Sequence, residues 1–213
     1  MAHRDKFTRL VTARTRLCLE GFPRSGNTFA FQCVTRGLGV PVADLAHHLH
    51  SVTNVRRAIA RKIPTFRRPR ACCSSLVVLG VAPTLADAYR GYRAYYEAVL
   101  PLLRDVTLVP FEDLVAQPEI FTDAVARCLN IPGIDPASLS SVRETLEAEE
   151  ASKLHRGKRP VHSAQYPRAA KNQMKDAVLG GSGSPETHML AEVCNALHDR
   201  VLAAAPRRVG DLR

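Results

Sequence analysis

The sequence predicts an α/β protein with a short central parallel sheet flanked by helices. Two observations support this fold class. Residues 15–22 (TRLCLEGF) form a β-rich stretch that runs into a glycine-containing loop and then into a helical pattern over 28–38. Residues 106–111 (VTLVPF) have the composition of a buried strand and follow a long helical segment. A strand, a loop and a helix in this order are typical of the opening of a parallel sheet.

The remaining elements follow from local patterns. Thr84 is a candidate N-cap for a helix over 84–103, and a proline in the first turn begins a helix over 118–129. Pro110 is expected to end the strand over 106–111, since proline lacks the N–H that a ladder needs. We also expect a brief strand over 63–66, and helices over 51–61, 136–151 and 185–205.

The bulk composition fits a single folded domain over residues 1–213. The apolar fraction of 46% is enough for a hydrophobic core. Two segments differ in character: an N-terminal extension over 1–14, and a basic, polar stretch over 152–184 that we interpret as a mobile loop with one helix over 168–178.

The net charge of +10, from 30 basic and 20 acidic side chains, favours a polyanionic partner. Nucleic acid, an anionic lipid surface and a phosphate-rich nucleotide are the alternatives. The basic clusters at 67–70 and 156–159 are too short to be basic tails, and no zinc-finger spacing or RNA-binding aromatic motif is present. We therefore expect a nucleotide or acidic substrate, and no nucleic acid.

The chain shows no targeting or membrane-spanning pattern. Residues 1–10 are polar and basic and lack the apolar core of a signal peptide. No run of about 20 apolar residues occurs, so we expect a cytoplasmic protein without a transmembrane segment. The six cysteines are expected to be buried thiols, and the adjacent pair Cys72 and Cys73 lacks the spacing of a zinc site.

The segment Gly21-Phe-Pro-Arg-Ser-Gly-Asn-Thr28 has the spacing of a phosphate-binding loop. Such a loop turns its backbone N–H groups inward, and the helix that follows adds partial positive charge. Nucleoside triphosphatases carry a lysine where this chain has Asn27, which disfavours hydrolysis of ATP or GTP. Arg24 instead supplies a cation within the loop. A turn without function is the alternative, and a kinase that binds magnesium through Glu112 or Asp113 stays open.

The segment LEGFPRSGNTFAF resembles the 5′-phosphosulfate loop of the sulfotransferases that use 3′-phosphoadenosine 5′-phosphosulfate (PAPS). This resemblance implies a three-layer fold of the P-loop type. It also implies that the phosphosulfate is bound by the residues that match the family pattern, which are Pro23, Arg24, Ser25, Gly26, Asn27, Thr28 and Phe29.

A second segment, Arg67-Arg-Pro-Arg-Ala-Cys-Cys-Ser-Ser75, is similar to the 3′-phosphate motif of the same family. The resemblance implies that Arg67 and Ser75 bind that phosphate, the arginine by paired hydrogen bonds and the serine from a helix start. Arg70 and Ser74 are the alternatives, and a solvated basic turn is the non-functional interpretation. Arg68 stands where most relatives have a carboxylate.

Further matches with the family concern the residues after position 106. The segment from the strand over 106–111 to the helix over 118–129 is similar to a family strand, turn and helix, which makes Glu112 and Asp113 structural. In the family a basic loop then folds over the cofactor. In this chain the corresponding candidates are Lys158, Arg159 and Arg168.

The implied reaction is transfer of a sulfuryl group from PAPS to a hydroxyl or amine without a metal, leaving adenosine 3′,5′-bisphosphate. Arg24 is the candidate cation for the leaving phosphate. In relatives a histidine between the two motifs is the base; His50 holds the closest position, and His48 is second. A surface turn, or a zinc site from His47, His48 and His50, is the alternative.

The sequence leaves the acceptor open among small molecules, lipids and carbohydrates, and it leaves the oligomeric state open. We expect the acceptor pocket to be lined by residues 39–61, the helix from Thr84 and the basic loop near Lys158. Three other functions stay as alternatives: an ATP- and magnesium-dependent P-loop kinase, a binder of nucleic acid or anionic surfaces, and a catalytically impaired PAPS-binding homologue.

Overall fold

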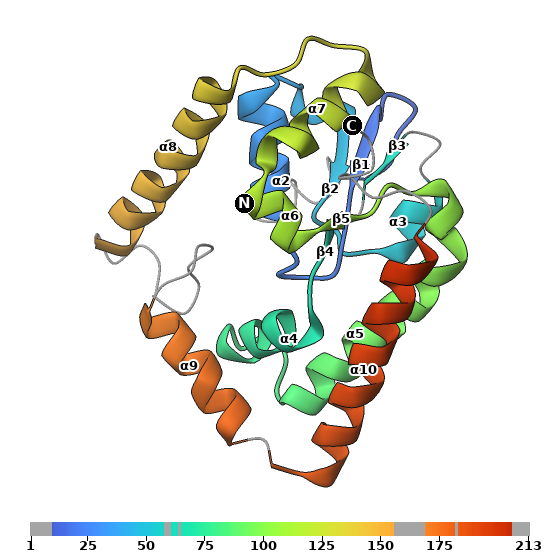
Figure 1. Cartoon of the computed structure of the whole chain (residues 1–213), viewed down its shortest axis with the longest axis vertical. Helices are drawn as coiled ribbons and strands as arrows, with labels where there is room; N and C mark the ends of the chain where they lie inside the picture. Colours follow the sequence, from blue (N-terminus) through green and yellow to red (C-terminus); the bar gives the residue numbers. More distant parts are fainter. Residues whose placement is uncertain (1–9, 58–60, 64, 156–168, 182, 206–213) are drawn as a thin grey trace.

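The computed structural model of the chain describes residues 10–57, 61–63, 65–155, 169–181 and 183–205 (Figure 1). Within these residues, short strands are paired in two parallel sheets, and helices make up most of the rest. The α/β class is thereby confirmed in its coarse form. No helix in these ranges is both long and apolar enough to cross a membrane.

The strands are short and all their pairings are parallel. In the first sheet, β1 (Leu17–Leu19) lies between β2 (Leu45–His47) and β3 (Arg61–Lys62); in the second, β4 (Thr65–Phe66) pairs with β5 (Val109–Pro110).

Backbone hydrogen bonds connect the two sheets. Ile63 N donates to Cys18 O at 2.9 Å, and Thr65 N donates to Glu20 O at 2.8 Å. The chain after β3 therefore continues alongside the carboxyl end of β1 until it enters β4.

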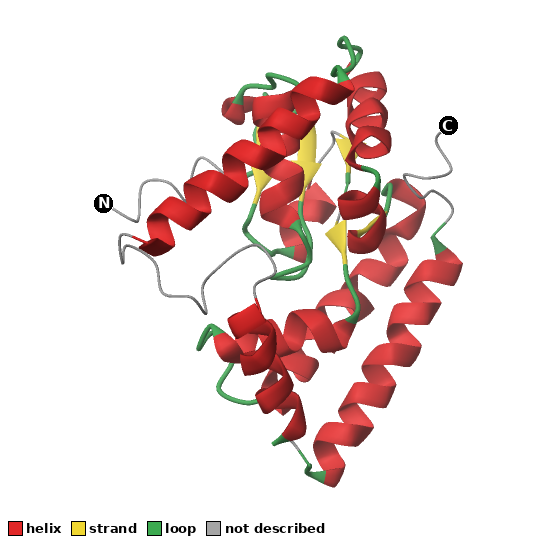
Figure 2. Ribbon diagram, turned by 60° about the vertical axis from the view of Figure 1, so that its left-hand side comes forward, coloured by secondary structure: helices red, strands yellow, loops and turns green. Residues whose placement is uncertain are grey.

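The helices lie around these strands (Figure 2). In chain order they are α2 (Asn27–Gln32), the π-helical turn η1 (Cys33–Gly37), the 3-10 turn η2 (Val42–Asp44), α3 (Val52–Arg57), α4 (Pro69–Val78), α5 (Leu85–Val99), the 3-10 turn η3 (Leu100–Asp105), α6 (Phe111–Ala116), α7 (Pro118–Leu129), α8 (Pro136–His155), α9 (Ala169–Gly180) and α10 (Pro185–Ala204).

The apolar core is divided between two main clusters. Leu17 and Leu19 of β1 belong to one cluster, which also holds Val34 and the α7 residues Phe121 and Val125. The second cluster lies around α5, which packs along α10 in Figures 1 and 2. Its largest fully buried side chains are Tyr92, Tyr96 and Phe66.

Local signals located several helices correctly. The helix over 118–129 is confirmed as α7 with the same bounds. Thr84 caps α5 as expected, since its hydroxyl accepts a hydrogen bond from Asp87 N at 3.1 Å. The helix over 185–205 is confirmed as α10, and Ser184 is its N-cap.

Other elements are shorter than expected. The strand over 106–111 is reduced to Val109–Pro110, because Pro110 cannot donate to a ladder and α6 begins at Phe111. The strand over 63–66 is reduced to Thr65–Phe66. The helix over 84–103 ends at Val99, beside Pro101, and continues as a 3-10 turn. The helix over 51–61 is described only over Val52–Arg57.

Two further predictions differ in their bounds. The helix over 28–38 divides into α2 and a π-helical turn that ends at Gly37. The helix over 136–151 extends to His155 as α8. In the stretch over 152–184, which was expected to be a loop with one helix, the structure shows the end of α8 and then α9. Residues 156–168 of that stretch lie outside the described residues.

Candidate functional site

The predicted phosphate loop connects β1 to α2 and has a tightly constrained backbone. Arg24 has a φ of 70° and Gly26 a φ of 102°, both in the left-handed region. A Cβ atom at Gly26 would lie 2.8 Å from a ring carbon of Phe111, so glycine is required there for space as well as for conformation. The hydroxyl of Ser25 is buried and donates to Phe22 O at 2.6 Å.

Asn27 braces the loop from the inside. Its side chain is 4% exposed, and its amide nitrogen donates to Gly21 O at 3.3 Å and Phe22 O at 3.2 Å. Its amide oxygen accepts a hydrogen bond from the Thr65 hydroxyl. At the position where a triphosphatase has a lysine that reaches phosphate, this chain therefore has a side chain that holds the loop carbonyls.

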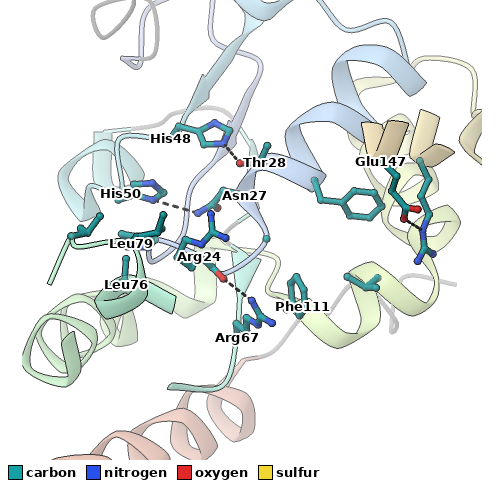
Figure 3. Close-up of a pocket in the computed structure, with 16 residues that line it drawn as sticks. Arg24, Asn27, Thr28, His48, His50, Arg67, Leu76, Leu79, Phe111 and Glu147 are labelled. Carbon is teal, nitrogen blue, oxygen red and sulfur yellow. Dashed lines mark hydrogen bonds and ion pairs between the residues drawn. The ribbon is translucent and has the colours of Figure 1, made fainter. Parts of the chain in front are cut away.

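The two predicted motifs meet in space through Arg24. Its Nε donates to the Ser75 hydroxyl at 3.0 Å. Arg67 donates from a terminal guanidinium nitrogen to Arg24 O at 3.1 Å (Figure 3). These contacts join residues separated by 51 and 43 positions in the sequence. The loop and the segment after β4 thus form one basic site.

Ser75 contributes differently from its predicted role. It lies in the interior of α4 and not at a helix start, because α4 already begins at Pro69. It is 2% exposed, and its hydroxyl fixes the Arg24 guanidinium. The alternative residues are placed elsewhere: the Ser74 hydroxyl donates to Arg70 O within the helix, and Arg70 is exposed.

The Arg67 guanidinium is held over an aromatic ring. Its central carbon lies 3.8 Å from the ring centroid of Phe111, a cation–π contact. Burial lowers the pKa of Arg67, although the nearby Cys72 and Glu112 act in the opposite direction. Its Nε is buried and has no hydrogen-bond partner in the described part of the chain. Arg67 also lines the pocket, where a partly desolvated guanidinium is well suited to attract an anion.

A further cation, Lys175 of α9, is near enough to Arg67 and Arg24 to feel their charges, although it is not among the described lining residues of the pocket. Burial lowers the pKa of the Lys175 ammonium, and the positive charges of Arg67 and Arg24 lower it further. Lys175 was not predicted as a site residue, because its distance along the chain gives no sign of this proximity. The predicted Lys158 and Arg159, and Arg168 with them, lie outside the described residues.

His50 approaches the loop from the turn after β2. Its Nδ1 lies 2.8 Å from Gly21 O and 3.3 Å from the Asn27 amide nitrogen. A carbonyl only accepts, so the shorter contact places the proton on Nδ1 and the lone pair on Nε2. A neutral imidazole in this tautomer can act as a base through Nε2.

The other two histidines of the cluster differ in exposure. His48 lines the pocket, and its Nε2 lies 3.2 Å from the Thr28 hydroxyl. His47 is 5% exposed, and its ring stacks on Phe31 with centroids 4.1 Å apart. His48 and His50 therefore face the site, whereas His47 packs into the protein.

A pocket of about 430 Å³ lies over the loop. Figure 3 shows His48 and His50 on one side of Arg24, and Phe111 on the other. Of the regions expected to line it, residues 39–61 contribute these two histidines, and the helix from Thr84 is not among the described lining residues. The remaining lining residues are Pro23, Gly26, Asn27, Thr28, Phe29, Arg67, Leu76, Leu79, Val81, Val115, Arg143 and Glu147.

The acidic residues after β5 lie outside this pocket. Glu112 and Asp113 are exposed in the first turn of α6, and neither is among the lining residues. Among the described residues, no group of three or more His, Cys, Asp or Glu side chains is arranged to hold a metal ion.

Glu20 is a buried carboxylate that the sequence did not single out. It is 0% exposed at the end of β1, beside the first glycine of the loop. Burial raises its pKa, while hydrogen bonds from Asn54 and from the backbone after His48 act in the opposite direction. The one sequence signal was a carboxylate directly between a buried strand and a phosphate-binding loop.

Comparisons of the chain with models of known protein families, with curated proteins and with solved structures find no match.

Proposed function

We propose that the protein is a PAPS-dependent sulfotransferase with a three-layer fold of the P-loop type. The observation that carries this proposal is the junction of the two basic motifs. The Arg67 guanidinium donates to the backbone oxygen of Arg24 at 3.1 Å, and both arginines line the same pocket. A nucleotide with phosphates on both its 5′ and 3′ positions requires two such cationic groups close together.

In this proposal the loop N–H groups at the start of α2 and Arg24 bind the 5′-phosphosulfate, and Arg67 binds the 3′-phosphate. Ser75 orients the Arg24 guanidinium through its hydroxyl. The acceptor oxygen forms a bond to sulfur as the bond from sulfur to the phosphate oxygen breaks. The acceptor proton passes to Nε2 of His50, and the charge that develops on the leaving phosphate is stabilised by Arg24.

The P-loop kinase is less well supported by the same geometry. Its magnesium ligand was expected from Glu112 or Asp113, and both are exposed outside the pocket. Its phosphate-binding lysine is replaced by Asn27, whose amide is turned to the loop carbonyls. Both parts that a triphosphate site requires are therefore lacking in the positions where they were expected.

The acceptor and the location of the protein are part of the proposal. The pocket offers the aliphatic side chains Leu76, Leu79 and Val81 beside the two histidines, and a small molecule, a lipid or a carbohydrate stays open as acceptor. All six cysteines carry thiols rather than disulfides, which supports a reducing compartment such as the cytoplasm.

Thermal denaturation with added nucleotides tests the proposal. Adenosine 3′,5′-bisphosphate in the presence of EDTA is expected to raise the Tm, because a ligand that binds only the folded state stabilises it. Adenosine 5′-monophosphate, which lacks the 3′-phosphate, is expected to act more weakly. Stabilisation by ATP with magnesium alone, or by an oligonucleotide alone, would contradict the proposal.

Turnover is measured separately with labelled PAPS and a panel of alcohols, phenols, amines and sugars. Transfer of the label to one class identifies the acceptor. Binding of adenosine 3′,5′-bisphosphate without transfer to any member of the panel would favour the catalytically impaired homologue.

A further inference from the structure

The Glu20 carboxylate is surrounded by hydrogen-bond donors. Its Oε2 accepts from His50 N at 2.8 Å, and its Oε1 accepts from Leu49 N at 3.2 Å and from the Asn54 side-chain nitrogen at 2.9 Å. A carboxylate only accepts, so this arrangement matches its ionised form. The side chain is fully buried, and it does not line the pocket.

The turn that Glu20 binds has an unusual backbone. His48 has a φ of 57° and His50 a φ of 51°, a region that residues other than glycine rarely adopt. A backbone with left-handed residues directs successive N–H groups to one side, where they form a concave site for an anion. Here the anion is supplied by the protein itself, since Leu49 and His50 N–H groups both point to Glu20.

The same strand end also holds the His50 ring. The ring Nδ1 lies 2.8 Å from the carbonyl oxygen of Gly21, the residue after Glu20. The backbone of His50 is thus fixed by position 20 and its ring by position 21. Asn54 supports this arrangement from α3: it is 4% exposed and accepts a hydrogen bond from Val11 N at 3.0 Å.

We propose that Glu20 is a positioning residue that holds the turn over 48–50 against the end of β1 and thereby keeps the His50 ring in its orientation at the pocket. The catalytic consequence rests on the proposed function, in which His50 is the base. Glu20 acts only through His50, because it is buried away from the pocket.

Nitrogen-15 NMR of the histidine rings tests the positioning without any need for activity. In the wild-type protein, with adenosine 3′,5′-bisphosphate absent, the His50 ring is expected in the tautomer protonated at Nδ1. Glu20→Gln is expected to shift the His50 signals toward a mixture of tautomers and to leave those of His188, exposed on α10, unchanged. Unaltered His50 signals in a folded Glu20→Gln protein would overturn the proposal.

A double-mutant cycle tests the catalytic consequence. Glu20→Gln is expected to lower kcat about 100-fold, the effect of a displacement of about 1 Å, with the affinity for adenosine 3′,5′-bisphosphate unchanged. In a His50→Ala background the same substitution is expected to have no further effect on kcat, because the side chain that Glu20 positions is absent. A loss of equal size in both backgrounds would assign Glu20 a merely structural role.

Two variants keep this test decisive. Glu97→Gln makes the same substitution at an exposed site on α5 and should leave kcat and the His50 signals unaltered. If Glu20→Gln does not fold, Asn54→Ala removes one donor to the carboxylate and should give a smaller loss that also disappears without His50. Failure of the wild-type protein to bind adenosine 3′,5′-bisphosphate would refute the proposed function, and the NMR result would then decide the positioning by itself.

Discussion

Arg24 donates a hydrogen bond from its Nε to the Ser75 hydroxyl at 3.0 Å, although 51 residues separate the two in the chain. This contact fixes the Arg24 guanidinium from α4, and Arg24 lines the pocket. Arg67 completes the group through its hydrogen bond to Arg24 O. Substitution of these arginines is therefore the most direct test of whether the protein binds a nucleotide with two phosphate groups.

Arg67→Lys is expected to weaken binding of adenosine 3′,5′-bisphosphate by about 10- to 100-fold. Lysine keeps the charge but loses the planar fork and the contact with Phe111, and one hydrogen bond to a charged group is worth about 1.5–3 kcal/mol. Isothermal titration calorimetry measures the effect. Arg70→Ala is the matched control, since Arg70 is exposed on α4 and should leave the affinity unchanged. If Arg70→Ala weakened nucleotide binding and Arg67→Lys did not, Arg70 and not Arg67 would be the residue that binds the 3′-phosphate.

Gly26→Ala is expected to destabilise the protein and to weaken nucleotide binding together. A Cβ atom there meets Phe111 at 2.8 Å and Leu114 at 3.3 Å, so the ring under Arg67 must move. Gly39→Ala provides the control, because Gly39 also has a positive φ, of 67°, but has nothing within 4 Å of the added atom. Gly39→Ala should cost about 1–2 kcal/mol of strain and leave binding intact. Urea unfolding measures the loss of stability, and calorimetry measures the loss of nucleotide affinity. Equal losses in the Gly26→Ala and Gly39→Ala proteins would argue against a steric clash with Phe111.

Asn27→Ala is expected to lower the free energy of unfolding by about 1–3 kcal/mol, the cost of buried polar groups left without a partner. The carbonyls of Gly21 and Phe22 would lose the amide that now holds them. Asn172→Ala, at an exposed position of α9, should change stability by less than about 0.5 kcal/mol. Urea unfolding compares the two variants. An Asn27→Ala protein as stable as the wild type would show that the loop keeps its conformation without the hydrogen bonds from the Asn27 amide.

The sequence predicted those elements whose signals are local. Thr84 begins a helix because its side chain caps the next turn, and the helix of Pro118–Leu129 carries its own start signal. The loop spacing between Gly21 and Gly26 predicted a tight loop after β1, and glycine is needed at Gly26 because the backbone is left-handed there. Such features depend on neighbours within a few residues, so they can be predicted without knowledge of the fold.

The features that were missed depend on contacts between distant segments. Glu20 became a candidate only when the turn over 48–50 was found at the end of β1. The electrostatic effect of Arg67 and Arg24 on Lys175 likewise depends on where α9 lies in the fold. Ser75 was expected at a helix start, but α4 begins six residues earlier at Pro69, and the serine contacts Arg24 from the helix interior. Spacing in the sequence gives the residue types of this site, but not the direction from which each one approaches.

His198 is expected to make the stability of the protein dependent on pH below about 6.5. It is 4% exposed and stacks on Phe66 with centroids 4.5 Å apart. Burial lowers its pKa below the ordinary value of 6.5, although the hydrogen bond that its ring makes to the Asp199 carboxylate acts in the opposite direction. As the pH falls below that value, the unfolded chain takes up the proton before the folded protein does, so the free energy of unfolding decreases. Above it, both states are neutral at this site and the contribution is constant.

His198→Phe retains a ring for stacking on Phe66 and removes the titrating group. Urea unfolding at several pH values between about 5 and 8 should therefore show a weaker loss of stability on acidification than in the wild-type protein. His188→Phe, at an exposed position of the same helix, should retain the wild-type dependence. If the wild-type and His198→Phe proteins lose stability in parallel, the acid sensitivity arises from other groups and His198 is not desolvated in solution as its packing against Phe66 requires.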